Sequence, residues 1–299
     1  MESQAANIVA EQASVASRLS AYFELTKPRI AIMLVLSSAA GFYLGSRWAF
    51  DFILFANSMI AILLLAFGVA TLNQYLERDI DAKMPRTSGR PLPSSRLMPS
   101  QALIFGIILT AASLIYLLLA VNTLTAVLGV LVVIGYVFLY TPLKTKTSAC
   151  TAIGAIPGAM PPLMGWTSAT NEISIGAWIL FAYLFLWQFP HFLSIARLYR
   201  EDYKLAGIKM LPVLEENGSI TARQIVIYGL LTSLVSVAPF FFGYANLVFL
   251  ILATLLAVWF SIECIKAAFD RTSKGSRRLL LVTVIHLPLY FTVLVLNKI

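Results

Sequence analysis

The chain has 299 residues, of which 59% are hydrophobic and only 12% charged, and its mean hydropathy is +0.84. So few polar side chains cannot cover a soluble globule of this length, and the composition predicts an all-α integral membrane protein with many spans. The formal net charge of +8 is compatible with nucleic-acid binding. A one-sided distribution of basic residues and an anionic ligand account for that charge, so we expect no nucleic-acid partner.

Nine apolar runs follow a polar N-terminal tail over residues 1–23, and each is long enough to cross the hydrocarbon layer of a lipid bilayer. They cover residues 30–49, 52–72, 102–120, 122–140, 150–167, 176–196, 224–243, 245–262 and 279–297. The expected architecture is a bundle of about nine transmembrane helices in one polytopic domain over residues 24–299. Pro157, Pro161 and Pro162 interrupt the fifth run, and such breaks are tolerated where neighbours or water satisfy the freed carbonyls, so we expect this run to line a cavity.

A ladder of oxygen-bearing side chains follows the second run. Asn73, Glu77 and Asp81 are four residues apart, so on a helix they lie within roughly 80° of one another and span about 12 Å. Asp79 points roughly opposite and is expected to be a solvated or capping residue. Because Mg²⁺ prefers carboxylates together with substrate phosphate oxygens, the ladder predicts a magnesium–diphosphate site. The alternative is a charged helix end at the lipid headgroups.

Basic residues of two further segments complete this predicted site. Arg86 and Arg90 follow the ladder, and their planar guanidinium groups suit phosphate oxygens. At the end of the fourth run, Lys144 offers another phosphate donor, and Tyr140 offers a hydroxyl or a ring that stabilises a developing carbocation. The alternative for this pair is an interfacial tyrosine beside a lysine that extends to the headgroups.

A second polar segment follows the sixth run and is dense in functional groups: Tyr199, Arg200, Glu201, Asp202, Tyr203 and Lys204. Asp202 is the candidate for a second metal ligand or for orienting water, and Arg200 is a candidate diphosphate ligand. The alternative is a solvated network in which Arg200 and Lys204 pair with neighbouring acids.

The chain has two histidines, and His191 lies near the end of the sixth run on the same side as these segments. It is a candidate ligand for an iron porphyrin or a proton-transfer group. A histidine hydrogen-bonded to a neighbouring helix is the more common arrangement in a bundle and remains an alternative.

The basic residues are distributed very unevenly between the two ends predicted for the bundle. With nine spans, every lysine and arginine except Arg47 and Lys298 falls on one face. By the positive-inside rule this face is cytoplasmic, and so is the N-terminus. All candidate site residues belong to the same face. Cys150 and Cys264 are far apart and have no metal-ligand spacing, so we expect neither a disulfide framework nor a zinc site.

These motifs resemble the UbiA superfamily of intramembrane prenyltransferases over roughly residues 24–297. The motif Asn73-x-x-x-Glu77-x-x-x-Asp81, followed by Arg86 and Arg90, is similar to the magnesium and diphosphate segment of that family, and Tyr140-x-x-x-Lys144 to a second signature. Three further stretches resemble the branch that prenylates haem: 151–166, 199–203 and 206–212. Quinone-forming relatives usually carry two aspartates where this chain has Tyr199 and Tyr203.

The resemblance implies transfer of a farnesyl group from farnesyl diphosphate to a vinyl group of haem B, which with added water gives haem O and releases diphosphate. It implies that Mg²⁺ is the cofactor, held by Asn73, Glu77, Asp81 and Asp202. The bilayer is then a bacterial-type inner membrane, and a downstream haem-modifying enzyme or oxidase is an expected partner. The alternative acceptor is an aromatic quinone precursor. A more distant alternative is an ion-coupled transporter, which predicts ionisable groups deep within the spans.

Overall fold

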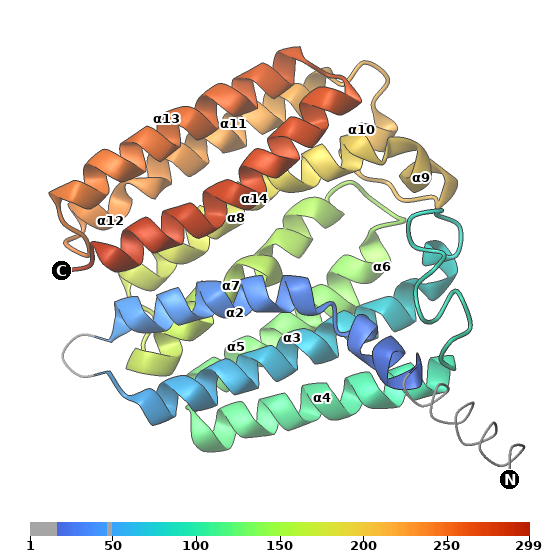
Figure 1. Cartoon of the computed structure of the whole chain (residues 1–299), viewed down its shortest axis with the longest axis horizontal. Coiled ribbons are helices and arrows are strands. Elements are labelled where there is room, and N and C mark those ends of the chain that lie inside the picture. The colour runs from blue at the N-terminus through green and yellow to red at the C-terminus, as the bar shows by residue number, and fades with distance from the viewer. Residues whose placement is uncertain (1–16, 47–49) are drawn as a thin grey trace, which may run out of the picture.

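The computed structural model describes residues 17–46 and 50–299, and over these residues the chain forms helices joined by loops. Figure 1 shows long helices that pass back and forth between two ends of a bundle. They are α2 (Pro28–Gly45), α3 (Phe52–Asp81), α4 (Pro99–Ala120), α5 (Thr123–Val133) continued by η1 (Ile134–Tyr140) and α6 (Thr141–Leu143), α7 (Cys150–Thr170), α8 (Ile175–Leu198), α11 (Ser219–Ser236) followed by α12 (Ala238–Phe241), α13 (Leu247–Phe269) and α14 (Ser273–Leu296). Two short helices, α9 (Arg200–Leu205) and α10 (Leu211–Leu214), lie between α8 and α11.

Eight units of the described chain are long and apolar enough to cross a membrane, when α5 to α6 and α11 to α12 are each counted as one. Helix α7, with 21 residues, is a ninth of similar length, which confirms the prediction of about nine spans. Large apolar side chains such as Leu119 and Leu234, which are 79% and 68% exposed, point outward from the bundle. An apolar exterior of this kind suits contact with lipid, and the chain is a multi-pass membrane protein.

Helix α7 lies between α2 and α8 and is continuous through its three prolines, with 14 of its 21 residues buried. Its backbone approaches α2 closely: a Cβ on Gly41 would collide with the Pro162 carbonyl, and one on Gly165 with the Ser38 carbonyl. Small residues are needed where helices pack this tightly. This requirement explains why the run has few large apolar side chains, and the helix is buried between its neighbours instead of facing lipid.

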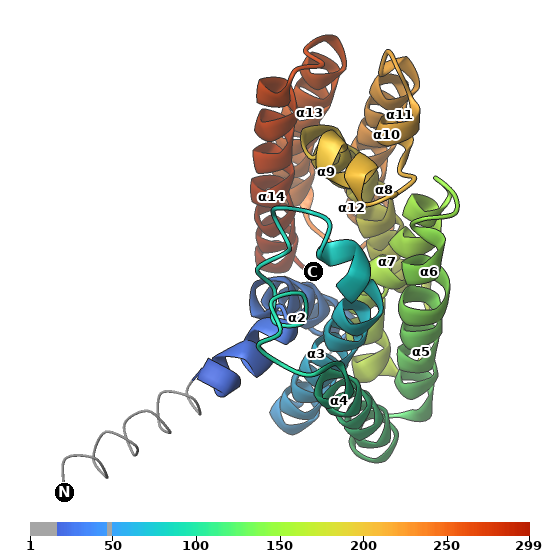
Figure 2. The same ribbon diagram turned by 90° about the vertical axis from the view of Figure 1, so that its right-hand side faces the viewer.

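All the loops with dense charge lie at one end of the bundle, on the right of Figure 1, which we call the basic end. In the view from that side, α9, α10 and the loop after α3 cover it (Figure 2). Residues 17–25 form a helical segment there, in which Ala21 and Leu25 pack against Leu92 and Leu97. The remainder of the tail predicted over 1–23 lies outside the described residues, as does Arg47.

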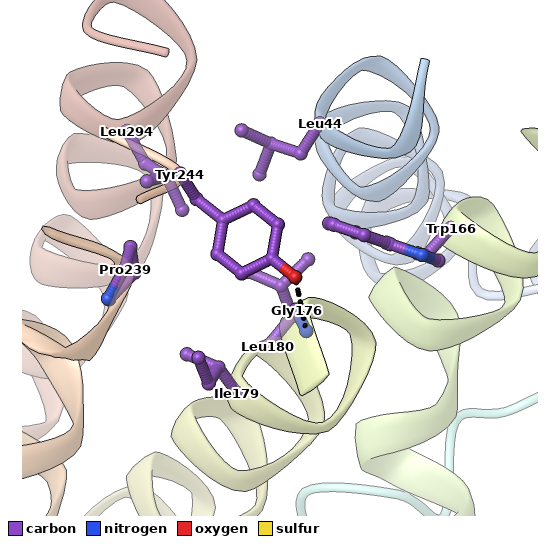
Figure 3. A pocket seen from close by; sticks show the side chains of 8 residues that line it. All are labelled: Leu44, Trp166, Gly176, Ile179, Leu180, Pro239, Tyr244 and Leu294. Atoms are coloured by element: carbon purple, nitrogen blue, oxygen red, sulfur yellow. Dashed lines mark hydrogen bonds between the residues drawn. The ribbon is translucent and has the colours of Figure 1, made fainter. Parts of the chain in front are cut away.

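The opposite end contains Lys298, whose Nζ donates to the carbonyls of Tyr43 and Ser46 at the end of α2. A small pocket lies at this end (Figure 3), where the Gly176 N–H donates to the Tyr244 hydroxyl at 3.2 Å beside Trp166. Its volume of about 10 Å³ leaves room for no more than about one water molecule. It is therefore too small to be a substrate site.

A larger apolar groove of about 430 Å³ lies between α2 and α14. Side chains such as Met33, Leu36, Phe291 and Val295 line it. Because both helices cross the membrane, the groove lies at the level of the lipid chains.

Candidate active site

The predicted ladder occupies the last turns of α3. This helix has 30 residues and is about 45 Å long, so it extends past a hydrocarbon layer of roughly 30 Å into the basic end. Asn73, Glu77 and Asp81 face the interior and are only 1%, 5% and 1% exposed, whereas the Asp79 side chain is 82% exposed. The helical spacing therefore separates the ladder from Asp79, as predicted.

Each buried carboxylate of the ladder has a cationic partner. The Lys144 Nζ lies 2.6 Å from Glu77 Oε1, and the Arg90 Nη1 lies 2.7 Å from Asp81 Oδ2. Burial disfavours the charge of Lys144, but the Glu77 carboxylate outweighs it and raises the pKa of Lys144 well above its ordinary value of 10.5. Buried charges persist only when they are paired in this way, so each acid fixes the position of a cation in the site.

A third cation, Lys27, enters the site from the start of α2, and the sequence-based prediction missed it. Its Nζ donates to Asn73 Oδ1 at 2.8 Å. The Lys27 backbone is left-handed, with φ of 49°, and the Gln74 amide donates to the carbonyls of Glu24 and Leu25, three and two residues earlier. Burial of the ammonium, followed by repulsion from Arg90, lowers the pKa of Lys27 from 10.5 to about 8. A left-handed lysine is uncommon and costs free energy, which is typical of functional sites.

Near its end the fourth span is a π-helix, η1, and α6 begins directly after it with another residue that the sequence did not single out. The Thr141 hydroxyl donates to the Tyr136 carbonyl at 2.8 Å and lies 3.0 Å from Asn73 Nδ2, which donates to it. After η1 the chain continues as α6, in which Pro142 has no N–H to donate to a preceding carbonyl. No hydrophobic periodicity reveals such a turn, and Thr141 was detectable only as the neighbour of Tyr140 in the Tyr140–Lys144 motif.

The first polar segment (residues 73–90) and the second polar segment (residues 199–216) meet at the basic end. The Arg86 guanidinium carbon lies 4.7 Å from the centre of the Tyr199 ring. The Lys209 N–H donates to the Lys144 carbonyl at 2.7 Å. Tyr140, whose ring lies 4.6 Å from Lys144 Nζ, packs with Ile80 and Tyr203 around one apolar cluster. Both predicted segments therefore contribute to one surface.

Three candidate residues, Arg200, Asp202 and His191, make their contacts away from the ladder of Asn73, Glu77 and Asp81. Arg200 donates to the Glu215 carbonyl at 2.6 Å. The Asp202 carboxylate is half-buried and makes no ion pair within residues 17–46 and 50–299. His191 is stacked on Trp187, and its Nδ1 lies 2.8 Å from Thr283 Oγ1 on α14, which leaves Nε2 as its other polar atom.

The donor set of the first segment fits a magnesium ion with a diphosphate. In the described part of the chain, no three His, Cys, Asp or Glu side chains converge on one point, so Asp202 does not join Glu77 and Asp81 in such a group. Two carboxylates and one amide oxygen match the sites of Mg²⁺, which takes few protein ligands and fills its coordination with substrate oxygens and water. With Lys27, Lys144 and Arg90, these groups carry one net positive charge, which complements the roughly one negative charge of a magnesium diphosphate.

The model of the UbiA prenyltransferase family matches residues 34–287. The chain therefore belongs to the UbiA prenyltransferase family. It is 44% identical over 286 residues to a protoheme IX farnesyltransferase of Solibacter usitatus, with 93% of this chain and 98% of that protein covered.

Solved structures support the fold at lower identity. A digeranylgeranylglyceryl phosphate synthase superimposes with a TM-score of 0.79 and 16% identity, covering 94% of this chain and 98% of the other. A UbiA homologue from Archaeoglobus fulgidus, bound to GPP and Mg²⁺, superimposes with a TM-score of 0.66 and 16% identity, covering 92% of this chain and 99% of the other. The likeness confirms the all-α membrane fold that the apolar runs predict.

Proposed function

We propose that this protein transfers the farnesyl group of farnesyl diphosphate to a vinyl group of haem B, giving haem O and diphosphate. The observation that carries the proposal is the buried ladder of Asn73, Glu77 and Asp81, surrounded by cations at the mouth of an apolar bundle. The similarity of the chain to a protoheme IX farnesyltransferase over nearly its whole length supports haem as the acceptor.

In the proposed reaction the bond between C1 of the farnesyl group and the diphosphate oxygen breaks, and the electron pair leaves with diphosphate. A bond forms between C1 and the terminal carbon of the vinyl group. Water then adds to the adjacent carbon and loses a proton, which gives the hydroxyethylfarnesyl chain. The site must therefore stabilise negative charge at the leaving oxygen and positive charge at carbon, and must limit the access of bulk water.

The first polar segment stabilises the negative charge in this proposal. Asn73, Glu77 and Asp81 would hold Mg²⁺, which supplies Lewis-acid stabilisation of the departing oxygen. Lys144 and Arg90 are already positioned by the acids, and they would neutralise the diphosphate as it leaves. Lys27 would join them, since its ammonium lies against the ladder.

Residues near the second polar segment serve the carbocation and the acceptor in this proposal. Tyr140 and Tyr199 would place ring faces near the positive charge, while Arg86, held against Tyr199, would reach the diphosphate. Asp202 would orient water or be a ligand of a second metal ion.

Two further candidates need rearrangement or a larger ligand to act. Arg200 would bind diphosphate after release from the Glu215 carbonyl. His191, whose Nδ1 is occupied by Thr283, would present Nε2 to the haem iron or accept the proton that water loses.

The proposed location is a bacterial-type inner membrane, with the basic end and the N-terminus in the cytoplasm. The positive-inside rule supports this orientation. Haem O is a substrate for further haem modification or for insertion into an oxidase, so an enzyme of that kind is the proposed downstream partner.

The test uses membranes from cells that produce the chain, incubated with labelled farnesyl diphosphate, Mg²⁺ and either haem B or a hydroxybenzoate. We expect label only in the haem fraction, with the mass of a hydroxyethylfarnesyl adduct, and none in matched membranes that contain Asp81→Ala. Label in the hydroxybenzoate and not in haem would mean that the acceptor is an aromatic quinone precursor. Transfer to neither acceptor would overturn the proposal.

A further inference from the structure

Asn73 is the one residue of the ladder whose two terminal atoms differ chemically. Its Oδ1 can bind a metal ion or accept a hydrogen bond, whereas its Nδ2 can only donate. An asparagine serves as a magnesium ligand only if Oδ1 points to the ion. The orientation of this amide is therefore part of the site, and the neighbours of Asn73 determine it.

Two neighbours contact the two ends of the amide. The Lys27 ammonium lies 2.8 Å from Oδ1 and has only donors, so it requires an oxygen. Thr141 Oγ1 lies 3.0 Å from Nδ2 and 2.8 Å from the Tyr136 carbonyl. A hydroxyl has a single proton, and donation to Tyr136 leaves Thr141 able only to accept from Asn73. Both neighbours therefore select the same orientation.

The π-turn makes the contact of Thr141 with the Tyr136 carbonyl possible. That carbonyl accepts from the Thr141 N–H, five residues on, and also from the Thr141 hydroxyl. In an α-helix the corresponding N–H would come from Tyr140, one residue earlier. Thr141 is 4% exposed, so both of its hydrogen bonds are sheltered from water.

The two neighbours differ in what a diphosphate does to them. Lys27 is a cation that a phosphate oxygen attracts, so it is free to leave Asn73 when substrate enters. Thr141 is neutral and fixed by the helix. We propose that Thr141 is a positioning residue that keeps Asn73 Oδ1 directed at the metal ion once Lys27 has turned to the diphosphate. The inference rests on the proposed function, because it assumes the magnesium–diphosphate site.

The test compares Thr141→Val, which removes the hydroxyl at nearly the same shape, with Thr141→Ser, which retains it. The measurement is the Mg²⁺ concentration that gives half-maximal thermal stabilisation of the purified protein with inorganic diphosphate present. Loss of a group that orients a ligand typically weakens metal binding by about tenfold or more, so we expect that increase for Thr141→Val and less than about a twofold change for Thr141→Ser. The melting temperature without Mg²⁺ reports any purely structural effect. If Thr141→Val does not fold, Thr141→Ala is measured with the same expectation.

A second background isolates the orientation of the amide. The carboxylate of Asn73→Asp has two oxygens, so either end can face the ion. In this background the Thr141 hydroxyl has no side-chain orientation to select. In that background we expect Thr141→Val to change the Mg²⁺ requirement by less than about twofold. An equal effect of Thr141→Val in both backgrounds, or no effect in the wild-type background, would overturn the inference alone. A wild-type protein that Mg²⁺ and diphosphate do not stabilise would overturn the proposed magnesium–diphosphate site as well.

Discussion

The two polar segments look equally rich in function as sequence, yet the structure builds them differently. In the first segment the two ladder acids, Glu77 and Asp81, are buried, and a cation lies against each carboxylate. In the second, Arg200 is held by a backbone carbonyl and the Asp202 carboxylate is half-buried. Burial together with a specific charge partner is typical of a functional site. A high density of charged residues in the sequence is also found in an ordinary solvated turn. The first segment should therefore dominate catalysis.

The largest effect should come from the acids of the ladder. We expect Glu77→Gln or Asp81→Asn to lower farnesyl transfer by about a thousandfold, since each removes a proposed metal ligand and leaves a cation without its partner. Initial rates on purified protein, normalised to the amount inserted in the membrane, would measure this. The matched control is Asp79→Asn on the same turn, whose exposed side chain predicts less than a twofold change. Equal rates for the ladder variants and Asp79→Asn would contradict the distinction between buried and exposed acids.

The next largest effect should come from the lysine that pairs with the ladder. We expect Lys144→Met to lower kcat/KM for farnesyl diphosphate by about a hundredfold. The negative charge that develops on the leaving diphosphate would lose the ammonium as a hydrogen-bond donor. Lys146→Met, two residues along the same loop and exposed, is the matched control with no expected change. Lys144→Arg retains the charge and should recover part of the loss. If Lys144→Met changed only the melting temperature, the lysine would be a structural partner of Glu77.

Local features of the sequence predict a large part of this arrangement. The nine spans follow from the length of the apolar runs. The common face of Asn73, Glu77 and Asp81 follows from the 3.6-residue repeat, which depends on local geometry alone. Lys27 and Thr141 did not emerge, because a left-handed turn and a π-helix place them and neither leaves a periodic signal. A lysine beside a proline at the start of a span is also a common interfacial anchor.

Other features depend on contacts between distant parts of the chain. The three prolines of α7 suggested an interrupted span, but close packing against α2 and α8 keeps the helix continuous. The number of acids in the second segment likewise says nothing of their burial. Residues 199–216 reach the site through the cation–π contact of Arg86 and the Lys209 N–H, and sequence spacing specifies neither.

A smaller effect is expected in the second segment, where Asp202→Asn should lower the transfer rate by about tenfold, in keeping with one oriented water or a distant ligand. Glu201→Gln is the matched control, since that neighbouring acid is exposed. The rates are compared with that of Asp81→Asn under the same conditions. A loss as large as that of Asp81→Asn would make the two segments equal contributors, and the contrast drawn between them would fail.

The smallest effect concerns a carboxylate of the second segment that serves structure. Glu215 accepts hydrogen bonds from the N–H groups of Ile220 and Thr221 and from the Thr221 hydroxyl, at the start of α11. Burial by itself raises the pKa of Glu215, but these donors outweigh it and hold the pKa below its ordinary 4.5. We expect Glu215→Gln to cost about 1 kcal/mol, or a few degrees of melting temperature, with normal transfer rates below that temperature.

The pH dependence of this effect distinguishes the carboxylate from a neutral cap. Because the folded pKa of Glu215 lies below the unfolded one, its stabilising effect is present above the unfolded pKa and is lost as pH falls through the folded pKa. The difference in melting temperature between wild type and Glu215→Gln should therefore be full at pH 7 and shrink below about pH 4.5. Glu216→Gln, on the adjacent exposed residue, should show no difference at either pH. A gap between wild type and Glu215→Gln that stayed constant down to pH 3 would mean that the side chain acts through shape, and that even the structural acids of the second segment contribute no charge.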